Sequence, residues 1–211
     1  MSKIHEVSDS LRDFILDVEA DVENVSAQRR EVLDRAVAFI LANPDSAALN
    51  FICTHNSRRS HLSHVWAHIA AYRFGLSGVR TCSGGTEATA CNERTAAALE
   101  RSGIDVASHQ GDSPDNPVYH LRFADAQPAL QIFSKVYSDP PNPTEGFAAM
   151  MCCSDVDERC PVVQGSAERI PLHYLDPKAS DGTDHESQTY DERCHEIAVE
   201  MFYVMKTAAK A

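Results

Sequence analysis

The chain of 211 residues carries 31 acidic and 19 basic side chains, which gives a formal net charge of -12 at pH 7. This acidic excess argues against nucleic acids and membrane surfaces as partners, because both attract basic proteins. No stretch reaches the roughly 18 apolar residues of a membrane span, and the N-terminus lacks the basic and then apolar order of a signal peptide. Seven cysteines at irregular spacing do not resemble a secreted disulfide framework. We therefore expect a cytoplasmic protein whose cysteines are reactive, metal-binding or packed in the core.

The first 45 residues are predicted to form a helical arm in two pieces. Apolar residues recur at helical spacing over 8–42, Ser26 is placed to cap the second piece, and Asn43 followed by Pro44 ends it. We expect the main domain to occupy 46–211. For the arm we consider three uses: packing on this domain, covering its site, or holding a homodimer together.

Beyond the arm, apolar runs and helical patterns alternate, which predicts an α/β fold around a parallel sheet. The expected strands are 48–52, 79–81, 147–152 and 169–173, and the expected helices are 61–74, 92–102 and 184–206. The continuous apolar run at 147–152 is typical of a strand buried on both faces. Between these elements we expect a loop at 104–117 and a β-hairpin or edge excursion over 118–136.

The most informative motif is Cys53-x5-Arg59-Ser60, because it stands where a buried strand turns into a helix. The start of a helix offers unpaired backbone N–H groups and a positive dipole end, which hold a tetrahedral oxyanion and favour a thiolate beside them. Cys53 is therefore a candidate nucleophile, Arg59 a bidentate ligand for the oxyanion, and Ser60 a hydrogen-bond donor to the thiolate.

The rest of the loop is predicted to bind the same anion through its backbone and side chains. Asn56 suits the left-handed conformation that such a loop demands. The expected substrate-binding residues are Thr54, His55, Asn56, Ser57, Arg58 and Ser60. Downstream, Asp176 before Pro177 is a candidate general acid that would protonate a leaving oxygen.

A second constellation consists of Cys153 and Cys160, directly after the apolar run at 147–152. Because the carboxyl ends of parallel strands meet at one edge of a sheet, we expect Cys153 to lie near Cys53. Three thiols placed in this way form a relay, in which the second attacks the adduct on the first and the third resolves the disulfide. Two other interpretations stay open: a zinc site, which the Cys-x6-Cys spacing does not favour, and inert packing cysteines. Four cysteines are interpreted as structural: Cys82, Cys91, Cys152 and Cys194.

These residues together resemble the low-molecular-weight protein tyrosine phosphatase superfamily, and within it the thioredoxin-coupled arsenate reductases. The phosphatase part lies in the residues from Cys53 to Ser60, in Ser83-Gly84-Gly85, in Gly103-Ile104-Asp105 and in Asp176-Pro177. The reductase part lies in the residues from Cys153 to Pro161, which ordinary phosphatases of this fold do not need.

The resemblance implies a three-layer fold with a four-stranded parallel sheet over about 47–207, with the arm at 1–45 and the hairpin region at 117–137 as additions. It also implies reduction of arsenate to arsenite for arsenic detoxification. Cys53 would attack arsenate, Cys153 would displace arsenite, and Cys160 would move the disulfide to Cys153–Cys160. Thioredoxin or a similar dithiol would then reduce that disulfide, without a bound cofactor or metal. The sequence departs from the family at His55, where Gly is usual, and at Arg58, where reductases often have Cys.

Two alternatives use the same residues differently. A phosphatase would hydrolyse phosphomonoesters through a phosphoenzyme on Cys53, although Lys178 stands where tyrosine phosphatases of this family carry aromatic residues. An oxyanion or metal sensor would use His61, His64 and His68, which share one helix face. Solvent-facing histidines are the more common explanation of that spacing.

Overall fold

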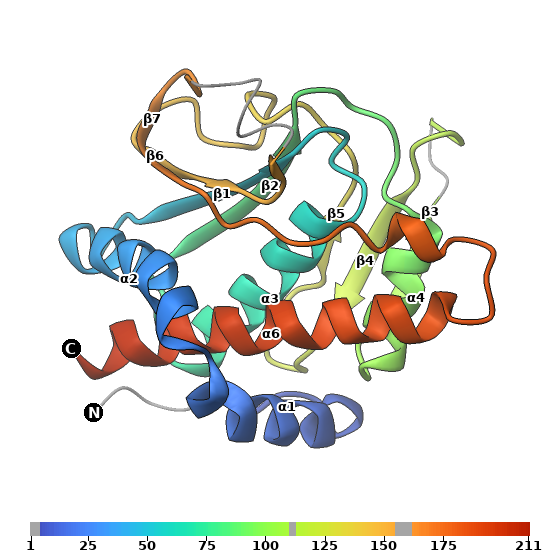
Figure 1. The fold of residues 1–211 in the computed structure, drawn as a ribbon, viewed down its shortest axis with the longest axis horizontal. Coiled ribbons are helices and arrows are strands. Elements are labelled where there is room, and N and C mark those ends of the chain that lie inside the picture. Colours follow the sequence, from blue (N-terminus) through green and yellow to red (C-terminus); the bar gives the residue numbers. More distant parts are fainter. Residues whose placement is uncertain (1–4, 110–112, 155–161) are drawn as a thin grey trace.

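The computed structural model describes residues 5–109, 113–154 and 162–211, and it contains two β-sheets (Figure 1). The main sheet is parallel, with the order β2-β1-β6-β7, and confirms the predicted α/β fold with four parallel strands. Its strands are β1 Ala48–Cys53, β2 Arg80–Gly85, β6 Phe147–Met151 and β7 Ser166–Ile170. Every residue of β1 and β6 is buried, as the apolar runs predict for the two central strands.

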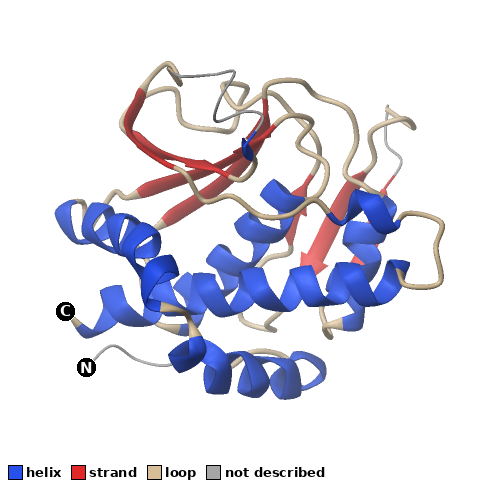
Figure 2. Ribbon diagram, in the orientation of Figure 1, coloured by secondary structure: helices blue, strands red, loops and turns tan. Residues whose placement is uncertain are grey.

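The strands are followed by the helices α3 Arg59–Arg73, α4 Glu93–Arg101 and α6 Glu186–Lys210. Helix α3 contacts β1 and β2, and the long α6 contacts both α3 and α4. Figure 2 shows α3 and α6 below the main sheet, whereas α4 stands beside the smaller sheet. No helix in the described residues combines the length and the apolar character needed to cross a membrane.

The predicted arm consists of α1 Asp9–Asp21, the 3-10 helix η1 Val22–Asn24 and α2 Ala27–Ala42. Ser26 caps α2 as expected, since its side chain accepts a hydrogen bond from the Arg29 N–H at 3.2 Å. Both α1 and α2 contact α6, and their buried Leu11 and Leu33 belong to the same hydrophobic core as Phe51 of β1. The arm therefore packs on the rest of the chain; a domain boundary near residue 45 and a homodimer stay predictions.

The region between α4 and β6, which includes the added hairpin region at 117–137, is called the inserted region. It differs from the predicted loop and hairpin. The hairpin is present as β4 Val118–Arg122 and β5 Leu130–Ile132, but it lies in a separate antiparallel sheet of order β3-β4-β5. Its third strand, β3 Asp105–His109, occupies part of the predicted loop. No β3 residue is fully buried, so β3 is held in the sheet by backbone hydrogen bonds. Because no side chain of β3 has to face a core, its sequence shows no alternation of apolar and polar residues.

Two strands of the main sheet are displaced from their predicted limits. Strand β7 ends at Ile170 rather than at 173, because Pro171 has no N–H to donate to the ladder. Strand β2 continues through Ser83-Gly84-Gly85, where Gly85 pairs with Cys53. The glycine motif thus lies beside the end of β1.

Candidate active site

The loop between β1 and α3 surrounds a small cavity. The residues that line it are Cys53, Thr54, His55, Ser57, Arg58, Arg59 and Asp176. The fold therefore brings the predicted general acid to the predicted nucleophile across more than 120 positions of sequence. Two predicted substrate-binding residues, Asn56 and Ser60, are fully buried beneath this cavity instead of lining it.

The Cys53 thiol is held by a short chain of hydrogen bonds. Its Sγ lies 3.1 Å from Ser60 Oγ, and Asn56 Nδ2 donates to that same Ser60 Oγ at 2.9 Å. Because the Asn56 amide supplies a donor to Ser60, the Ser60 hydroxyl proton is left for the sulfur. Asn56 adopts the predicted left-handed conformation, with φ 46°. This geometry suits a serine that stabilises a thiolate.

The inserted region holds the loop between β1 and α3 through hydrogen bonds, a role that the sequence did not indicate. Asn56 Oδ1 accepts a hydrogen bond from the Lys135 N–H at 3.0 Å, and the His55 carbonyl accepts one from Ser134 Oγ at 2.9 Å. Gly85 closes the other side, where a Cβ would lie 2.6 Å from the Thr54 carbonyl oxygen and 2.8 Å from the Asn56 nitrogen. The glycine at this position therefore permits the close packing of loop and strand.

Helix α3 presents its N-terminus to the cavity. Its N-cap is Arg58, whose side chain makes no capping hydrogen bond. The first N–H groups of a helix have no partner within it, and they lie at the positive end of the helix dipole. Over the 15 residues of α3, this arrangement offers backbone donors to an oxyanion beside Cys53.

Arg59 is bound by the segment that carries the predicted general acid. Its Nη2 lies 2.6 Å from Asp176 Oδ2, and its Nη1 donates to the Tyr174 carbonyl at 3.1 Å. The side chains of Arg59 and Asp176 are 13% and 35% exposed, so the ion pair is partly shielded from water. An oxyanion that binds Arg59 therefore competes with Asp176.

Arg58 faces a second carboxylate, Asp181, in the loop before α6. Its Nε donates to Tyr190 Oη at 2.6 Å and its Nη2 to Asp181 Oδ2 at 3.0 Å. Burial opposes the charge on Arg58, but the hydrogen bond to Tyr190 and the charges of Asp176 and Asp181 outweigh it and raise the Arg58 pKa. Tyr190 and Asp181 were not predicted as site residues, because Tyr190 fits the inner face of a helix and Asp181 an ordinary turn.

Cys153 lies beside the loop, as the parallel strands predict. In the register of the sheet Ile52 pairs with Met151, and the Cys152 N–H donates to the Ile52 carbonyl at 2.7 Å. The next residue places its Sγ 3.8 Å from Thr54 Oγ1, and Cys153 is 1% exposed. The other predicted relay residue, Cys160, lies outside the described residues.

The four cysteines interpreted as structural are all buried free thiols. Burial raises the pKa of Cys152, and the neighbouring Cys53 raises it further. Burial also raises the pKa values of Cys82 and Cys91, and it raises that of Cys194 to about 12. These groups therefore stay protonated at neutral pH, in agreement with a packing role.

Two of the three histidines on α3, His61 and His64, are turned toward the protein interior, whereas His68 is partly exposed. His61 and His64 are buried, although solvent-facing histidines were expected, and His61 Nδ1 lies 3.3 Å from Ser83 Oγ. Burial, followed by the charge of Lys135, lowers the His61 pKa to about 3, and burial also lowers that of His64. Within 5–109, 113–154 and 162–211, no group of three or more His, Cys, Asp or Glu side chains could hold a metal ion.

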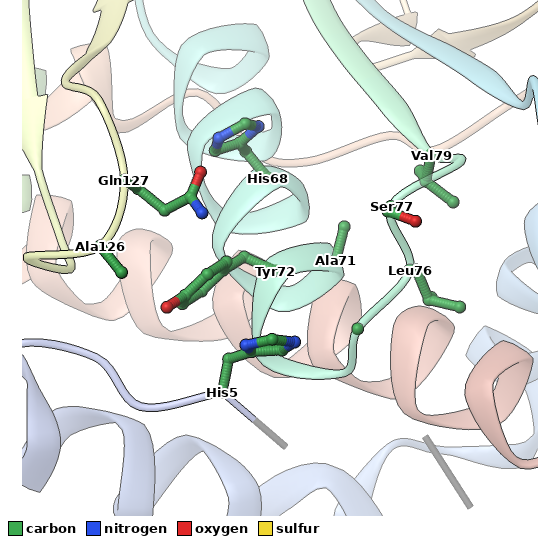
Figure 3. Close-up of a pocket in the computed structure, with 10 residues that line it drawn as sticks. His5, His68, Ala71, Tyr72, Leu76, Ser77, Val79, Ala126 and Gln127 are labelled. Atoms are coloured by element: carbon green, nitrogen blue, oxygen red, sulfur yellow. The ribbon is translucent and has the colours of Figure 1, made fainter. Parts of the chain in front are cut away.

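A larger hollow lies at the opposite end of α3 (Figure 3). His5, His68, Tyr72 and Gln127 supply its polar lining. Cys53 and the loop that follows it do not contribute to this hollow, so it is separate from the candidate active site.

Comparisons with known proteins point to one family. Residues 48–116 match the family model of low molecular weight phosphotyrosine protein phosphatases. The arsenate reductase 2 of Staphylococcus epidermidis is 24% identical over 133 residues, which cover 63% of this chain and 80% of that protein. The arsenate reductase of Bacillus subtilis is 24% identical over 149 residues, which cover 71% and 87%.

Two solved structures align with most of the chain. The low molecular weight phosphotyrosine phosphatase from Vibrio cholerae O395 aligns with a TM-score of 0.48 at 12% identity, covering 76% of this chain and 95% of that one. The corresponding protein from T. tengcongensis aligns with a TM-score of 0.47 at 12% identity, covering 76% and 99%.

Proposed function

Because the chain belongs to the low-molecular-weight phosphatase superfamily, with arsenate reductases among its relatives, we propose that it reduces arsenate to arsenite through a thiol relay. The observation that carries this proposal is the position of Cys153, whose sulfur lies 3.8 Å from the hydroxyl of Thr54, the residue after Cys53. A phosphatase needs one reactive thiol, whereas reduction needs a second thiol that reaches the adduct on the first.

In the first step, the Cys53 thiolate attacks the arsenic of bound arsenate. The backbone N–H groups at the start of α3, together with Arg59, hold the oxygens as charge develops on them. A sulfur–arsenic bond forms, and one oxygen leaves as water after Asp176 supplies a proton. Ser60, 3.1 Å from the sulfur, supports the thiolate before the attack.

In the second step, the Cys153 thiolate attacks the Cys53 sulfur. A disulfide forms between them, and the electron pair of the sulfur–arsenic bond stays on arsenic, which leaves as arsenite. The Cys160 thiolate then attacks Cys153, releases Cys53 as a thiolate and leaves a Cys153–Cys160 disulfide. Thioredoxin or a similar dithiol reduces this disulfide and is itself oxidised to a disulfide.

This chemistry requires a reducing compartment, so the proposal includes a cytoplasmic location. The free state of all six described cysteines is consistent with such a setting.

The second candidate function is phosphomonoester hydrolysis. It is favoured by the group of Cys53, Ser60, Arg59 and Asp176, which is complete without any further thiol. Cys53 would form a phosphoenzyme, and a water molecule would then release phosphate. Since arsenate and phosphate share their shape and charge, the same loop suits both.

The relay is tested by arsenite production with thioredoxin, thioredoxin reductase and NADPH. Wild-type protein is compared with Cys153→Ser, Cys160→Ser and a control, Cys82→Ser, which changes a buried thiol outside the cavity. We expect turnover to be lost in the first two variants and kept in the control. Full turnover of Cys160→Ser contradicts the relay. Efficient hydrolysis of p-nitrophenyl phosphate without arsenate reduction contradicts the reductase proposal and supports the phosphatase function.

A further inference from the structure

The segment between β7 and α6 crosses from the main sheet to the start of α6 (Figure 1). Its Asp176 lines the cavity of the candidate site. We refer to residues 172–181 as the strap. Three of its residues, Leu172, Tyr174 and Pro177, are buried, whereas Leu175 is exposed. Of the buried residues, Tyr174 also binds Arg59 through its carbonyl. What holds Tyr174 in place therefore fixes the position of the strap near Asp176.

Tyr174 is held by an ion pair between the N-terminal arm and α6. Arg29 of α2 donates to Glu200 of α6 through two nitrogens, Nε at 2.6 Å and Nη2 at 2.8 Å. The Tyr174 hydroxyl donates to Glu200 Oε2 at 2.6 Å, and the Arg29 guanidinium lies 4.9 Å from the centre of the Tyr174 ring. Glu200 and Tyr174 are each 5% exposed, so water does not compete effectively for these contacts.

The backbone of Tyr174 reaches the active-site residues directly. Its carbonyl accepts the hydrogen bond from Arg59 Nη1 at 3.1 Å, and its N–H donates to the Cys152 carbonyl at 3.2 Å. Asp176, two positions further, binds the other terminal nitrogen of Arg59. A continuous path of contacts thus leads from Arg29 through Glu200 and Tyr174 to Arg59 and Asp176.

We propose that Arg29 is a positioning residue for the active site, which acts through Glu200 and Tyr174 on Arg59 and Asp176. This inference rests on the proposed roles of Arg59 and Asp176 in oxyanion chemistry. It gives the arm a function in the reaction in addition to its packing on α6. The expected consequence is that breaking the ion pair misplaces the strap, because removal of one partner leaves a buried charge uncompensated and the remaining groups rearrange around it.

The chain offers a matched control on the same helix. Arg35 of α2 also forms an ion pair with a carboxylate outside the arm, Glu168 at 3.1 Å, and donates to the Arg169 carbonyl at 2.7 Å. Neither partner touches the strap in these contacts. Arg35→Met therefore removes an ion pair of the arm that is more exposed than that of Arg29 and does not include Tyr174.

The experiment measures kcat and KM of Arg29→Met and Arg35→Met, each alone and combined with Asp176→Asn. Turnover is followed with arsenate and with p-nitrophenyl phosphate. Because small displacements of reacting groups cost about ten- to a hundredfold in rate, we expect Arg29→Met to lower kcat by at least about tenfold and KM to change less. In the Asp176→Asn background, the same change is expected to cost clearly less than in the wild-type background, since the acid that it misplaces is already gone and only Arg59 is still displaced. Arg35→Met is expected to behave like the parent protein in both backgrounds.

Equal losses for Arg29→Met in both backgrounds overturn the proposal, because a purely structural role lowers the activity of any variant alike. Tyr174→Phe removes only one hydroxyl and replaces Arg29→Met in the experiment if that variant does not fold. Its loss of kcat must likewise be smaller in the Asp176→Asn background. Arg29→Lys, which keeps the charge, is expected to recover part of the lost kcat.

Hydrogen exchange separates this inference from the proposed function. We expect faster exchange of the strap amides in Arg29→Met than in Arg35→Met, independently of any activity. If the wild-type protein turns over neither substrate, the proposed function is wrong. Hydrogen exchange of the strap amides still tests whether Arg29 positions the strap. Strap exchange that is the same in both variants overturns the inference even where the enzyme is active.

Discussion

Replacing Asp176 by Asn is expected to change catalysis and anion binding in opposite directions. Asn keeps the shape of the side chain but can neither donate an acidic proton nor carry a charge. Loss of a general acid lowers a rate by about 10²- to 10⁴-fold, so kcat for p-nitrophenyl phosphate is expected to fall within that range. The same change releases Arg59, which Asp176 binds at 2.6 Å in the free protein.

The gain in binding follows from the exposure of that ion pair. With 13% and 35% of the two side chains exposed, we assign the pair about 0.5–1 kcal/mol, the range of partly solvated pairs. An oxyanion that no longer has to displace Asp176 recovers this energy. Because about 1.4 kcal/mol corresponds to a tenfold change, inorganic phosphate is expected to bind about two- to fivefold more tightly.

The assay combines steady-state hydrolysis with protection of Cys53 from alkylation by iodoacetamide at increasing phosphate concentration. Asp184→Asn, in the loop before α6, is the control and is expected to leave both measurements unchanged. A variant with lower kcat and weaker phosphate binding refutes the competition between Asp176 and the anion. An unchanged kcat refutes its role as the acid.

Three further predictions concern the loop and its support. Burial lowers the pKa of His61 to about 3 and also lowers that of His64, so these groups gain protons only on unfolding. The free energy of unfolding is therefore expected to fall from pH 6.5 toward pH 4, by up to about 1.4 kcal/mol per pH unit for each histidine. His64→Leu is expected to reduce this dependence on pH, measured by urea titrations that follow Trp66 fluorescence. Ser60→Ala removes a hydrogen bond to the thiolate, worth about 1.5 kcal/mol or more, and is expected to slow p-nitrophenyl phosphate hydrolysis at least about tenfold. Because it also leaves the buried Asn56 amide without its Ser60 acceptor, it is expected to lower the free energy of unfolding by about 1–3 kcal/mol in the same titrations. Gly85→Ala drives a Cβ into the loop backbone and is expected to cost about 1–3 kcal/mol in the same titrations, whereas an unchanged midpoint would contradict the close packing.

The sequence predicts those parts of the fold whose cause is local or periodic. The apolar run at 147–152 indicates a central strand, and the structure places β6 there. The Cys53 loop is predicted from the residue types between a strand and a helix, and its position next to Cys153 follows from the geometry of parallel sheets. By contrast, β3 is held by backbone pairing of residues that stay partly exposed, so its side chains carry no periodic signal.

Contacts between distant segments explain what the sequence did not indicate at the site. Ser134 and Lys135 hold the loop through one hydroxyl and one backbone N–H, and a backbone donor has no residue signature. Tyr190 meets Arg58 across 132 positions, and its spacing fits the inner face of α6 equally well. Catalytic residue types can thus be found in a loop motif, whereas the residues that position them depend on the tertiary fold.

The charge of the chain bears on how an anion enters this site. The net charge of -12 requires positive groups near the loop, and Arg58 and Arg59 were expected to supply them. In the free protein each is paired, Arg58 with Asp181 and Arg59 with Asp176. A bound oxyanion takes the place of the Asp176 carboxylate on Arg59, because both anions use the same guanidinium donors. Under the proposed function, substrate binding therefore releases Asp176 from Arg59, so that its side chain is free to face the leaving oxygen as the acid.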